Sequence, residues 1–318
     1  MAEMVKKATR ESFGETVTAL AAEYPEIVVL DADLAAATKT GIFKKAYPER
    51  FFDCGIAECN MVGVAAGLAT CGKIPFAASF AMFSAGRAFE QVRNSVGYPK
   101  LNVKIVGSHA GISVGEDGAT HQCCEDIALM RTIPGMVILN PCDHYEMQAA
   151  VRAAVEHKGP CYIRLGRLAV ESINNNDDYK FELGKGITLR EGTDITVVAT
   201  GLMVQEAVKA ADALKEEGIS VEVINIHTIK PLDEELVIAS AKKTGRVITV
   251  EEHNIIGGLG EAVSTALSEH CPTPVTRIGV NDVYGHSGPA VDLLKEFGLR
   301  SEERRVGKEC KLPWSTGM

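Results

Sequence analysis

The chain has 318 residues, of which 46% are hydrophobic, and its formal net charge at pH 7 is −9. This length predicts about two domains, and the acidic balance argues against nucleic acid or an anionic membrane surface as the main partner. No run approaches the roughly 20 apolar residues of a membrane span, and the N-terminal MAEMVKKATRESF lacks the apolar core of a signal peptide.

Short apolar runs alternate with amphipathic segments through the first half of the chain. This alternation, with continuous apolar strands, predicts a parallel sheet covered on both faces by helices. The segments predicted to be helical are Asn60 to Ala69 and Ser84 to Val96. The predicted strands are Ile27 to Leu30, Ile74 to Ala78, Val103 to Gly107, Met136 to Leu139 and Cys161 to Leu165.

A polar, turn-rich stretch, SINNNDDYKFEL, separates this half from a second α/β series. We therefore expect two doubly wound domains, at residues 1–170 and 191–299, joined by a linker at 171–190. A helix from Val204 to Glu217 is expected to end at Gly218. The strands predicted in the second domain are Ile195 to Ala199, Val221 to Ile226, Val247 to Val250 and Val275 to Ile278.

The segment GSHAGISVGEDGATHQ directly follows a predicted strand. Ligands of open α/β sheets bind beyond the carboxyl ends of the strands, so this position suits a site. The segment contains His109, Glu116, Asp117 and His121. Histidines near carboxylates suit proton transfer and hydrogen bonding to hydroxylated substrates. The alternative is a glycine-rich loop with solvated charges.

Glu58 stands where a strand-like start runs into a helix of small residues. Its neighbours in the sequence include Ile56 and Met61, and apolar surroundings favour the protonated form of a carboxyl group. The alternative is an acid stabilised by the helix dipole, by up to about 1 kcal/mol.

Two aromatic residues, Phe80 and Phe83, follow the strand predicted at Ile74 to Ala78. They would form a wall that receives a flat ring. Ordinary core aromatics are the alternative.

Together these segments resemble the transketolase family, over about residues 5 to 299. Three family motifs carry the resemblance: G-x-A-E-x-N-M, seen as Gly55 to Met61; F-x-x-F, seen as Phe80 and Phe83; and G-E-D-G-x-T-H-Q, seen within Val114 to Gln122. The resemblance implies a pyrimidine-binding domain with a parallel sheet, followed by a transketolase C-terminal domain with a mixed sheet.

The resemblance implies thiamine diphosphate as the cofactor. Glu58 would hydrogen-bond the aminopyrimidine ring and drive the proton relay that activates the thiazolium carbon, so that the cofactor acts as an electron sink. Phe80 and Phe83 would pack around the pyrimidine, and Asp33 would lie near the cofactor.

The same resemblance assigns substrate contacts. Arg10 and Arg167 would clamp a phosphate, which guanidinium groups bind in a bidentate way, and Arg164 is expected to be structural. The remaining expected contacts are with sugar hydroxyls or the phosphate, and they are made by His109, Asp117 and His121. The family often has a phosphate-binding serine where this chain has Ala37, and Thr38 is a candidate replacement.

The family binds the cofactor's phosphates through a G-D-G…N-N motif and Mg²⁺ (or Ca²⁺), and the sequence contains no G-D-G. The resemblance therefore implies a partner, the N-terminal transketolase subunit that carries this motif and holds the metal, in an α2β2 assembly. The chain is expected to be the C-terminal subunit of a split transketolase, acting on sugar phosphates in the pentose phosphate pathway, with no metal site of its own.

Three other functions compete with this interpretation. Deoxyxylulose-phosphate synthase shares the glutamate and a D-G-x-x-H loop, and the β chain of an oxo-acid dehydrogenase is also a separate subunit. The GEDGATHQ loop favours transketolase over both. A non-catalytic flavodoxin-like module is disfavoured by the presence of Glu58, His109, Asp117 and His121 together.

The nine cysteines form no C-x-x-C pair, and most fall in apolar stretches. They predict buried, reduced thiols in a cytoplasmic protein. No Cys/His cluster has zinc-ligand spacing. Residues 300–318 have no apolar periodicity and are rich in basic residues, and RSEERRVGKEC reads as translated sequencing adapter. We expect this tail to be non-native.

Overall fold

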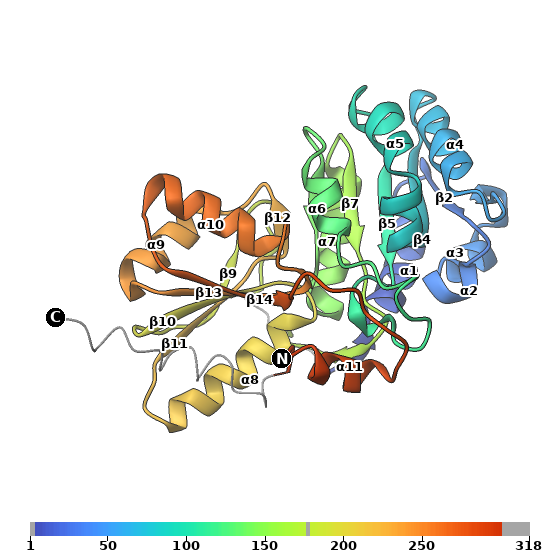
Figure 1. Cartoon of the computed structure of the whole chain (residues 1–318). Coiled ribbons are helices and arrows are strands. Elements are labelled where there is room, and N and C mark those ends of the chain that lie inside the picture. Colours follow the sequence, from blue (N-terminus) through green and yellow to red (C-terminus); the bar gives the residue numbers. More distant parts are fainter. Residues whose placement is uncertain (1–3, 176–178, 301–318) are drawn as a thin grey trace.

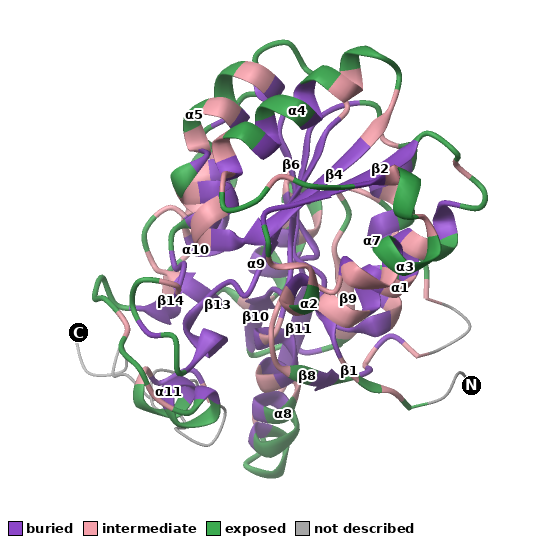
Figure 2. Ribbon diagram, turned by 90° about the vertical axis from the view of Figure 1, so that its right-hand side faces the viewer, coloured by how far each residue is buried: buried purple, intermediate pink, exposed green. Residues whose placement is uncertain are grey.

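The computed structural model describes residues 4–175 and 179–300, which form two α/β halves side by side, each with its own sheet (Figure 1). The prediction of two doubly wound halves is confirmed. Buried strands lie at the centre, and the surrounding helices expose their outer faces (Figure 2). The tail expected to be non-native lies, from residue 301 onward, outside the described residues.

The first sheet has seven strands in the order β12-β6-β7-β5-β4-β2-β3. All neighbours run parallel except β12, which comes from the second half of the chain and runs antiparallel to β6. Every strand predicted in this half is confirmed, with small shifts at the ends, and β3 lies at the strand-like start predicted before Glu58, whereas β12 was not expected. The bounds are β2 (Ile27–Asp31), β3 (Phe51–Asp53), β4 (Ile74–Phe80), β5 (Lys104–Ser108), β6 (Val137–Leu139), β7 (Cys161–Arg164) and β12 (Thr228–Lys230).

Side chains of the first sheet alternate between two cores, as the twofold period of a strand requires. Ile27 and Val29 pack against one helical layer, and Val28 and Leu30 pack against the other. The first layer consists of α1 (Thr9–Leu20), α3 (Gly41–Ala46) and α7 (His144–Glu156). The second consists of α4 (Glu58–Thr70), α6 (Asp126–Arg131) and the helical turns after β4.

The segment predicted as one helix from Ser84 to Val96 is helical but not regular. It is divided into two π-helical stretches around a short α-helical turn. These are η2 (Met82–Arg87), α5 (Phe89–Gln91) and η3 (Val92–Gly97). Within η2 the backbone N–H of Ala88 donates to the carbonyl of Phe83, and π-helical turns of this kind recur at functional sites.

The second sheet has the order β14-β13-β10-β11-β9 and is mixed, as expected, because β9 alone runs antiparallel. The predicted helix before Gly218 is confirmed as α8 (Met203–Glu216). The other helices are α9 (Glu234–Thr244), α10 (Leu259–His270) and α11 (Ala290–Glu296). The predicted strands are confirmed as β10 (Ile195–Ala199), β11 (Val221–Asn225), β13 (Val247–Asn254) and β14 (Val275–Val280), joined by β9 (Ile187–Arg190).

Smaller elements complete the chain. Strand β8 (Ala169–Glu171) returns to pair antiparallel with β1 (Lys6–Ala8), and β8 and β9 stand at the two ends of the predicted linker. The domain boundaries at 170 and 190 stay a prediction. The remaining short elements are α2 (Ala35–Thr38), η1 (Pro48–Arg50) and η4 (Ile112–Val114).

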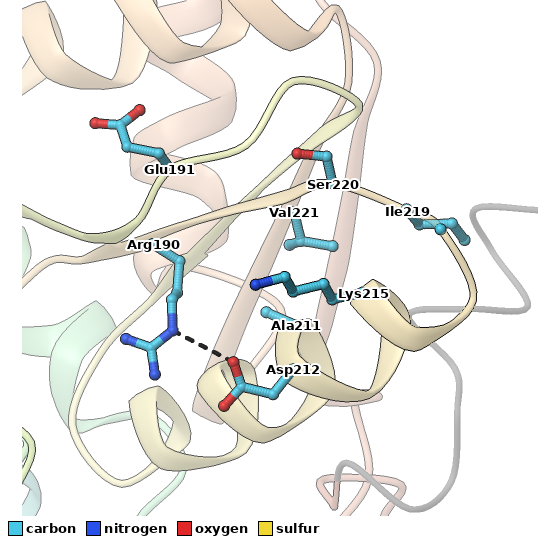
Figure 3. A pocket seen from close by; sticks show the side chains of 9 residues that line it. Arg190, Glu191, Ala211, Asp212, Lys215, Ile219, Ser220 and Val221 are labelled. Carbon is cyan, nitrogen blue, oxygen red and sulfur yellow. Dashed lines mark hydrogen bonds and ion pairs between the residues drawn. The ribbon is translucent and has the colours of Figure 1, made fainter.

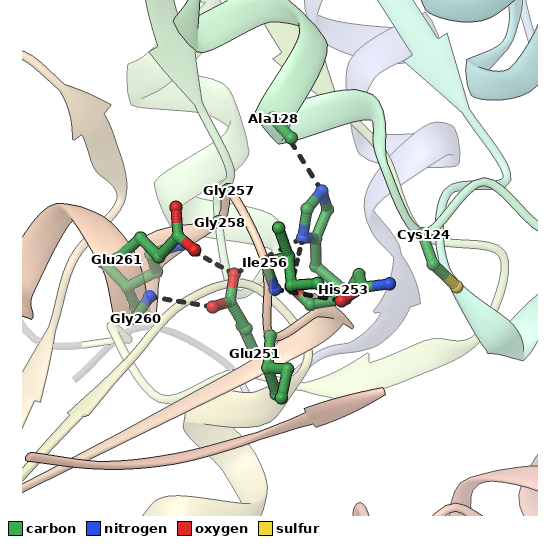
Figure 4. A network of polar contacts seen from close by, with 12 residues as sticks. Cys124, Ala128, Glu251, His253, Ile256, Gly257, Gly258, Gly260 and Glu261 are labelled. Atoms are coloured by element: carbon green, nitrogen blue, oxygen red, sulfur yellow. Dashed lines mark hydrogen bonds and ion pairs between the residues drawn. The ribbon is translucent and has the colours of Figure 1, made fainter. Parts of the chain in front are cut away.

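The two halves are joined at the start of α10 and the end of β13 (Figure 4). The backbone N–H of Ala128, in α6, donates to His253 Nε2 at 3.3 Å. The N–H of Asn254 donates to the carbonyl of Cys124 at 2.8 Å. These two hydrogen bonds connect the first half of the chain to the end of β13.

Candidate active site

Glu58 is the first residue of α4 and only 2% exposed. Its Oε2 accepts a hydrogen bond from Arg87 Nη1 at 2.9 Å. Of its apolar sequence neighbours, Ile56 is 76% exposed, whereas Met61 is buried. A buried carboxylate requires a paired charge, and here that charge comes from η2. Sequence reasoning missed Arg87, which is 29 positions away in the chain.

The two predicted aromatic residues come together with both predicted histidines. The rings of Phe80 and Phe83 stack with centroids 6.0 Å apart. His109 stacks on Phe80 at 4.1 Å, and His121 meets Phe83 edge-on at 5.2 Å. The guanidinium group of Arg87 lies over the ring of Phe83, with its central carbon 4.9 Å from the ring centroid. This ring cluster (Phe80, Phe83, His109 and His121) stands beside the Glu58–Arg87 pair.

His109 is buried beneath Phe80, at 4% exposure. Arg10 Nη1 lies 3.1 Å from His109 Nε2. An arginine can only donate, so Nε2 accepts, and Nδ1 carries the proton that it donates to Ser108 Oγ at 2.9 Å. Burial lowers the pKa of His109 to about 3, assisted by the charges of Arg10, Arg167 and Lys39. The imidazole is therefore neutral at physiological pH.

The cations around His109 are the two predicted arginines and Lys39. Arg10 donates to the carbonyl of Ala37 at 2.9 Å, and its buried Nε has no partner within the part of the chain that the structure describes. Burial, then the charge of Arg167, lowers the pKa of Arg10. Arg167 pairs with Glu116 at 2.5 Å and also donates to the carbonyl of Val114. Sequence reasoning missed Lys39.

Thr38 does not take the place of the phosphate-binding serine. It is fully buried, and its hydroxyl donates to Asp31 Oδ2 at 2.7 Å, where Thr40 also donates. Burial raises the pKa of Asp31, and the hydrogen bonds from Thr38 and Thr40 act in the opposite direction. The hydroxyl of Thr38 is thus committed to the interior.

Asp33 and Asp117 lie apart from these contacts. Both are exposed, and within the described ranges neither makes a hydrogen bond, ion pair or ring contact with the ring cluster. The backbone of Asp33 has a φ of 62°, and its N–H donates to Asp53 Oδ1 at 3.1 Å.

Arg164 is structural, as expected. It forms a buried ion pair with Asp126 at 2.8 Å and donates to the carbonyl of Glu252 at 2.9 Å. Because Glu252 belongs to β13, this contact also ties the two halves together.

A hollow of about 320 Å³ opens in the second half, between β9, α8 and β11 (Figure 3). Arg190 crosses it to Asp212 with an Nε–Oδ1 distance of 3.3 Å. None of the predicted site residues lines it.

Two kinds of feature are absent from the described residues 4–175 and 179–300. No group of three or more His, Cys, Asp or Glu side chains there is arranged to hold a metal ion. None of their helices is long and apolar enough to cross a membrane.

The two sheets define a two-domain α/β chain, and the ring cluster lies in its first half. Residues 5–172 match the transketolase pyrimidine binding domain, and residues 184–303 match the transketolase C-terminal domain. The chain belongs to the transketolase family, and it corresponds to the C-terminal part of the split form of that enzyme.

Three relatives illustrate the match. A transketolase C-terminal section of Methanocaldococcus jannaschii is 52% identical, over 96% of this chain and 98% of that protein. The 6-deoxy-6-sulfo-D-fructose transketolase subunit SqwH of Clostridium sp. (strain MSTE9) is 47% identical, over 92% of this chain and 91% of that protein. The solved structure of a split gene transketolase, an inactive beta4 tetramer, is 51% identical with a TM-score of 0.88. The match covers 95% of this chain and 97% of that chain.

Proposed function

We propose that the chain supplies the cofactor-activating glutamate in the reversible transfer of a two-carbon ketol unit between sugar phosphates. The proposal rests on one observation above all, which is the buried Glu58 beside the aromatic pair Phe80 and Phe83. A relative that is 47% identical is named as a transketolase subunit for a sulfo-sugar, which supports an anionic sugar as the substrate.

The residues present fit the aminopyrimidine of thiamine diphosphate. Glu58 Oε1 makes no hydrogen bond within the described residues, so it is available to a ring nitrogen. Phe80 and Phe83 offer near-parallel faces to a flat ring, with an angle of 8° between them. When bound, the cofactor supplies the electron sink for carbanion chemistry. Glu58 would hold and release the proton at Oε1, and Asp33 would lie nearby.

The substrate's anionic end would meet Arg10 and Arg167. The unpartnered, buried Nε of Arg10 supports this role, since a buried guanidinium nitrogen requires an acceptor. His109, which is neutral, would contact sugar hydroxyls together with His121, and Asp117 would accept from a hydroxyl next to the reacting carbon. Lys39 would add a third positive charge where Ala37 offers no hydroxyl.

The partner would be an N-terminal transketolase subunit that holds the diphosphate and Mg²⁺ (or Ca²⁺) through its G-D-G…N-N motif. Activity would then depend on both chains, in an assembly of two copies of each.

The test is ketol transfer from xylulose 5-phosphate to ribose 5-phosphate by the reconstituted pair, compared with Glu58→Gln. The variant should fold and bind its partner but lose exchange of the thiazolium proton for deuterium. Glu269→Gln, an exposed carboxylate on α10, is the control and should exchange normally. Normal exchange in Glu58→Gln would remove Glu58 from the mechanism.

A further inference from the structure

The Glu58–Arg87 contact is made by one nitrogen and one oxygen, and this asymmetry is informative. Arg87 Nη1 donates to Oε2 at 2.9 Å, whereas Oε1 has no hydrogen bond within the described residues. A bidentate pair would have engaged both oxygens. Arg87 thus holds one oxygen of the carboxyl group, and the other oxygen is available for a further hydrogen bond.

Arg87 is itself fixed from three directions. Its side chain reaches Glu58, and its guanidinium lies over the ring of Phe83 at 4.9 Å. Its backbone carbonyl accepts the thiol hydrogen of Cys59, the residue next to Glu58, at 3.6 Å. The end of η2 and the start of α4 are therefore joined by a side-chain contact and a backbone contact at the same point.

Building on the proposed function, we propose that Arg87 is a positioning residue. It holds Glu58 Oε2 so that Oε1 faces the cofactor's ring, and it stabilises the carboxylate that remains after Oε1 gives up its proton.

The step is balanced in protons and charge. When the cofactor is bound, the O–H bond at Oε1 would break, its proton would go to the ring nitrogen, and the electron pair would stay on the carboxylate of Glu58. A carboxylate at 2% exposure is stabilised by a cation in hydrogen-bond contact. The guanidinium remains charged throughout, since arginine does not deprotonate in proteins. Arg87 therefore favours the state in which the proton has left Glu58.

A purely structural role for Arg87 predicts different behaviour. Its side chain is 52% exposed, so its loss need not open a cavity. If it only stabilised the fold, any variant would change the unfolding temperature and leave the bound cofactor's protonation state unaltered.

The experiment compares Arg87→Met and Arg87→Lys in the chain reconstituted with its N-terminal subunit, thiamine diphosphate and Mg²⁺. Near-ultraviolet circular dichroism reports the protonation state of the bound aminopyrimidine, and calorimetry gives the cofactor Kd. We expect Arg87→Met to reduce the protonated-ring signal and the deuterium exchange rate by about tenfold, the low end for a charge-assisted contact. Arg87→Lys should recover most of both.

A second comparison separates this inference from the proposed function. In the Glu58→Gln background, adding Arg87→Met should change the dichroism signal no further, because the charge it stabilises is gone. A further tenfold change would overturn the inference, as would a wild-type signal in Arg87→Met. If Glu58→Gln itself keeps the wild-type signal and exchange rate, the proposed function fails as well.

Discussion

At the scale of single residues, His109 has a strained backbone and an uncharged side chain. Its φ of 55° lies in the left-handed region, which costs a residue with a side chain roughly 1–3 kcal/mol. The hydrogen bonds to Ser108 and Arg10 and the stacked ring of Phe80 offset this cost. Because burial keeps the imidazole neutral, with a pKa of about 3, His109 offers Arg10 an acceptor without adding a fourth positive charge.

Replacing Arg10 or Arg167 by alanine should weaken the binding of phosphorylated sugars. Each charge-assisted contact contributes about 1.5–3 kcal/mol, which corresponds to roughly a ten- to hundredfold rise in KM. Lys39→Met should act in the same direction but less, since an ammonium is a point charge without the guanidinium fork. Steady-state kinetics of the reconstituted pair measures all three.

Arg152→Ala is the matched control, because that arginine pairs with Glu23 on the surface. Its KM should stay at the wild-type value. A non-phosphorylated donor should be little affected by any of the variants. Equal losses for phosphorylated and non-phosphorylated donors would contradict the assignment of Arg10 and Arg167.

Local motifs predicted the four residues of the ring cluster. They did not predict Arg87 or Lys39. Phe80 and His121 were proposed from short segments, and the structure brings them within 6.1 Å of each other. Arg87 carries no local signal, since its partner Glu58 is 29 positions away. Lys39 was missed because it lies outside the three family motifs, next to Thr38, whose hydroxyl points into the interior.

At the scale of elements, the start of α10 is held by a buried carboxylate from β13 (Figure 4). The two oxygens of Glu251 accept from the backbone N–H groups of Leu259 and Gly260, at 2.7 and 2.8 Å. These are among the N–H groups that a helix start leaves unpaired. The segment EEHNIIGGLGE thus has a structural role at the joint between the halves.

Gly258→Ala should destabilise the chain. A Cβ at this position would lie 2.0 Å from Glu251 Oε2, so the carboxylate that caps α10 would have to move. Losing a cap costs about 1 kcal/mol, and leaving buried N–H groups unpaired costs about 1–3 kcal/mol more. Urea unfolding followed by circular dichroism measures the change.

Gly67→Ala is the comparison variant, since it lies within α4 and a Cβ there meets nothing within 4 Å. It should be neutral or stabilise by up to about 1 kcal/mol. If Gly258→Ala is as stable as Gly67→Ala, the capping role of Glu251 is wrong.

Regular elements were predictable from apolar runs, and short strands were not. Strand β10 has the predicted bounds, because a buried parallel strand is continuously apolar. Strands β1 and β8 have three residues each, and their pairing joins Lys6 to Glu171 across the whole first half. No local periodicity encodes such a pair. Strand β12 pairs with β6 in the other half of the chain, and no local pattern predicts that pairing either.

At the scale of the whole molecule, Glu146 lies where the two halves and the linker region meet. Its oxygens accept from the backbone of Cys142, from Tyr179 and from Asn225 of β11. Burial, followed by the charge of Asp143, raises the pKa of Glu146 to about 7. The joint between the halves therefore contains a carboxyl group that titrates near neutrality.

Stability should fall with rising pH through this group. The pKa of Glu146 is 4.5 for an unperturbed carboxyl and about 7 in the folded chain, so folding favours the protonated form. Its contribution is fully present below about pH 4.5 and is lost as the pH rises through 7. Relative to Glu146→Gln, the wild type should lose on the order of 2 kcal/mol between pH 5 and pH 8.

Urea unfolding at several pH values measures this difference in the free energy of unfolding. Glu216→Gln, which removes an exposed carboxylate at the end of α8, should follow the wild type. Parallel curves for the wild type and Glu146→Gln would mean that Glu146 does not titrate in this range.

Under the proposed function, two chains would share the binding of thiamine diphosphate. The sequence has no G-D-G motif. The diphosphate is the most highly charged part of thiamine diphosphate, and binding it requires compensating groups. Isothermal titration of the chain alone with thiamine diphosphate and Mg²⁺ should therefore give no micromolar binding. Adding the N-terminal subunit should produce binding, which Glu58→Gln should weaken less than it slows deuterium exchange, because Glu58 is assigned to proton movement at the ring. Micromolar binding by the chain alone would reveal a phosphate site within it and would contradict the proposed division.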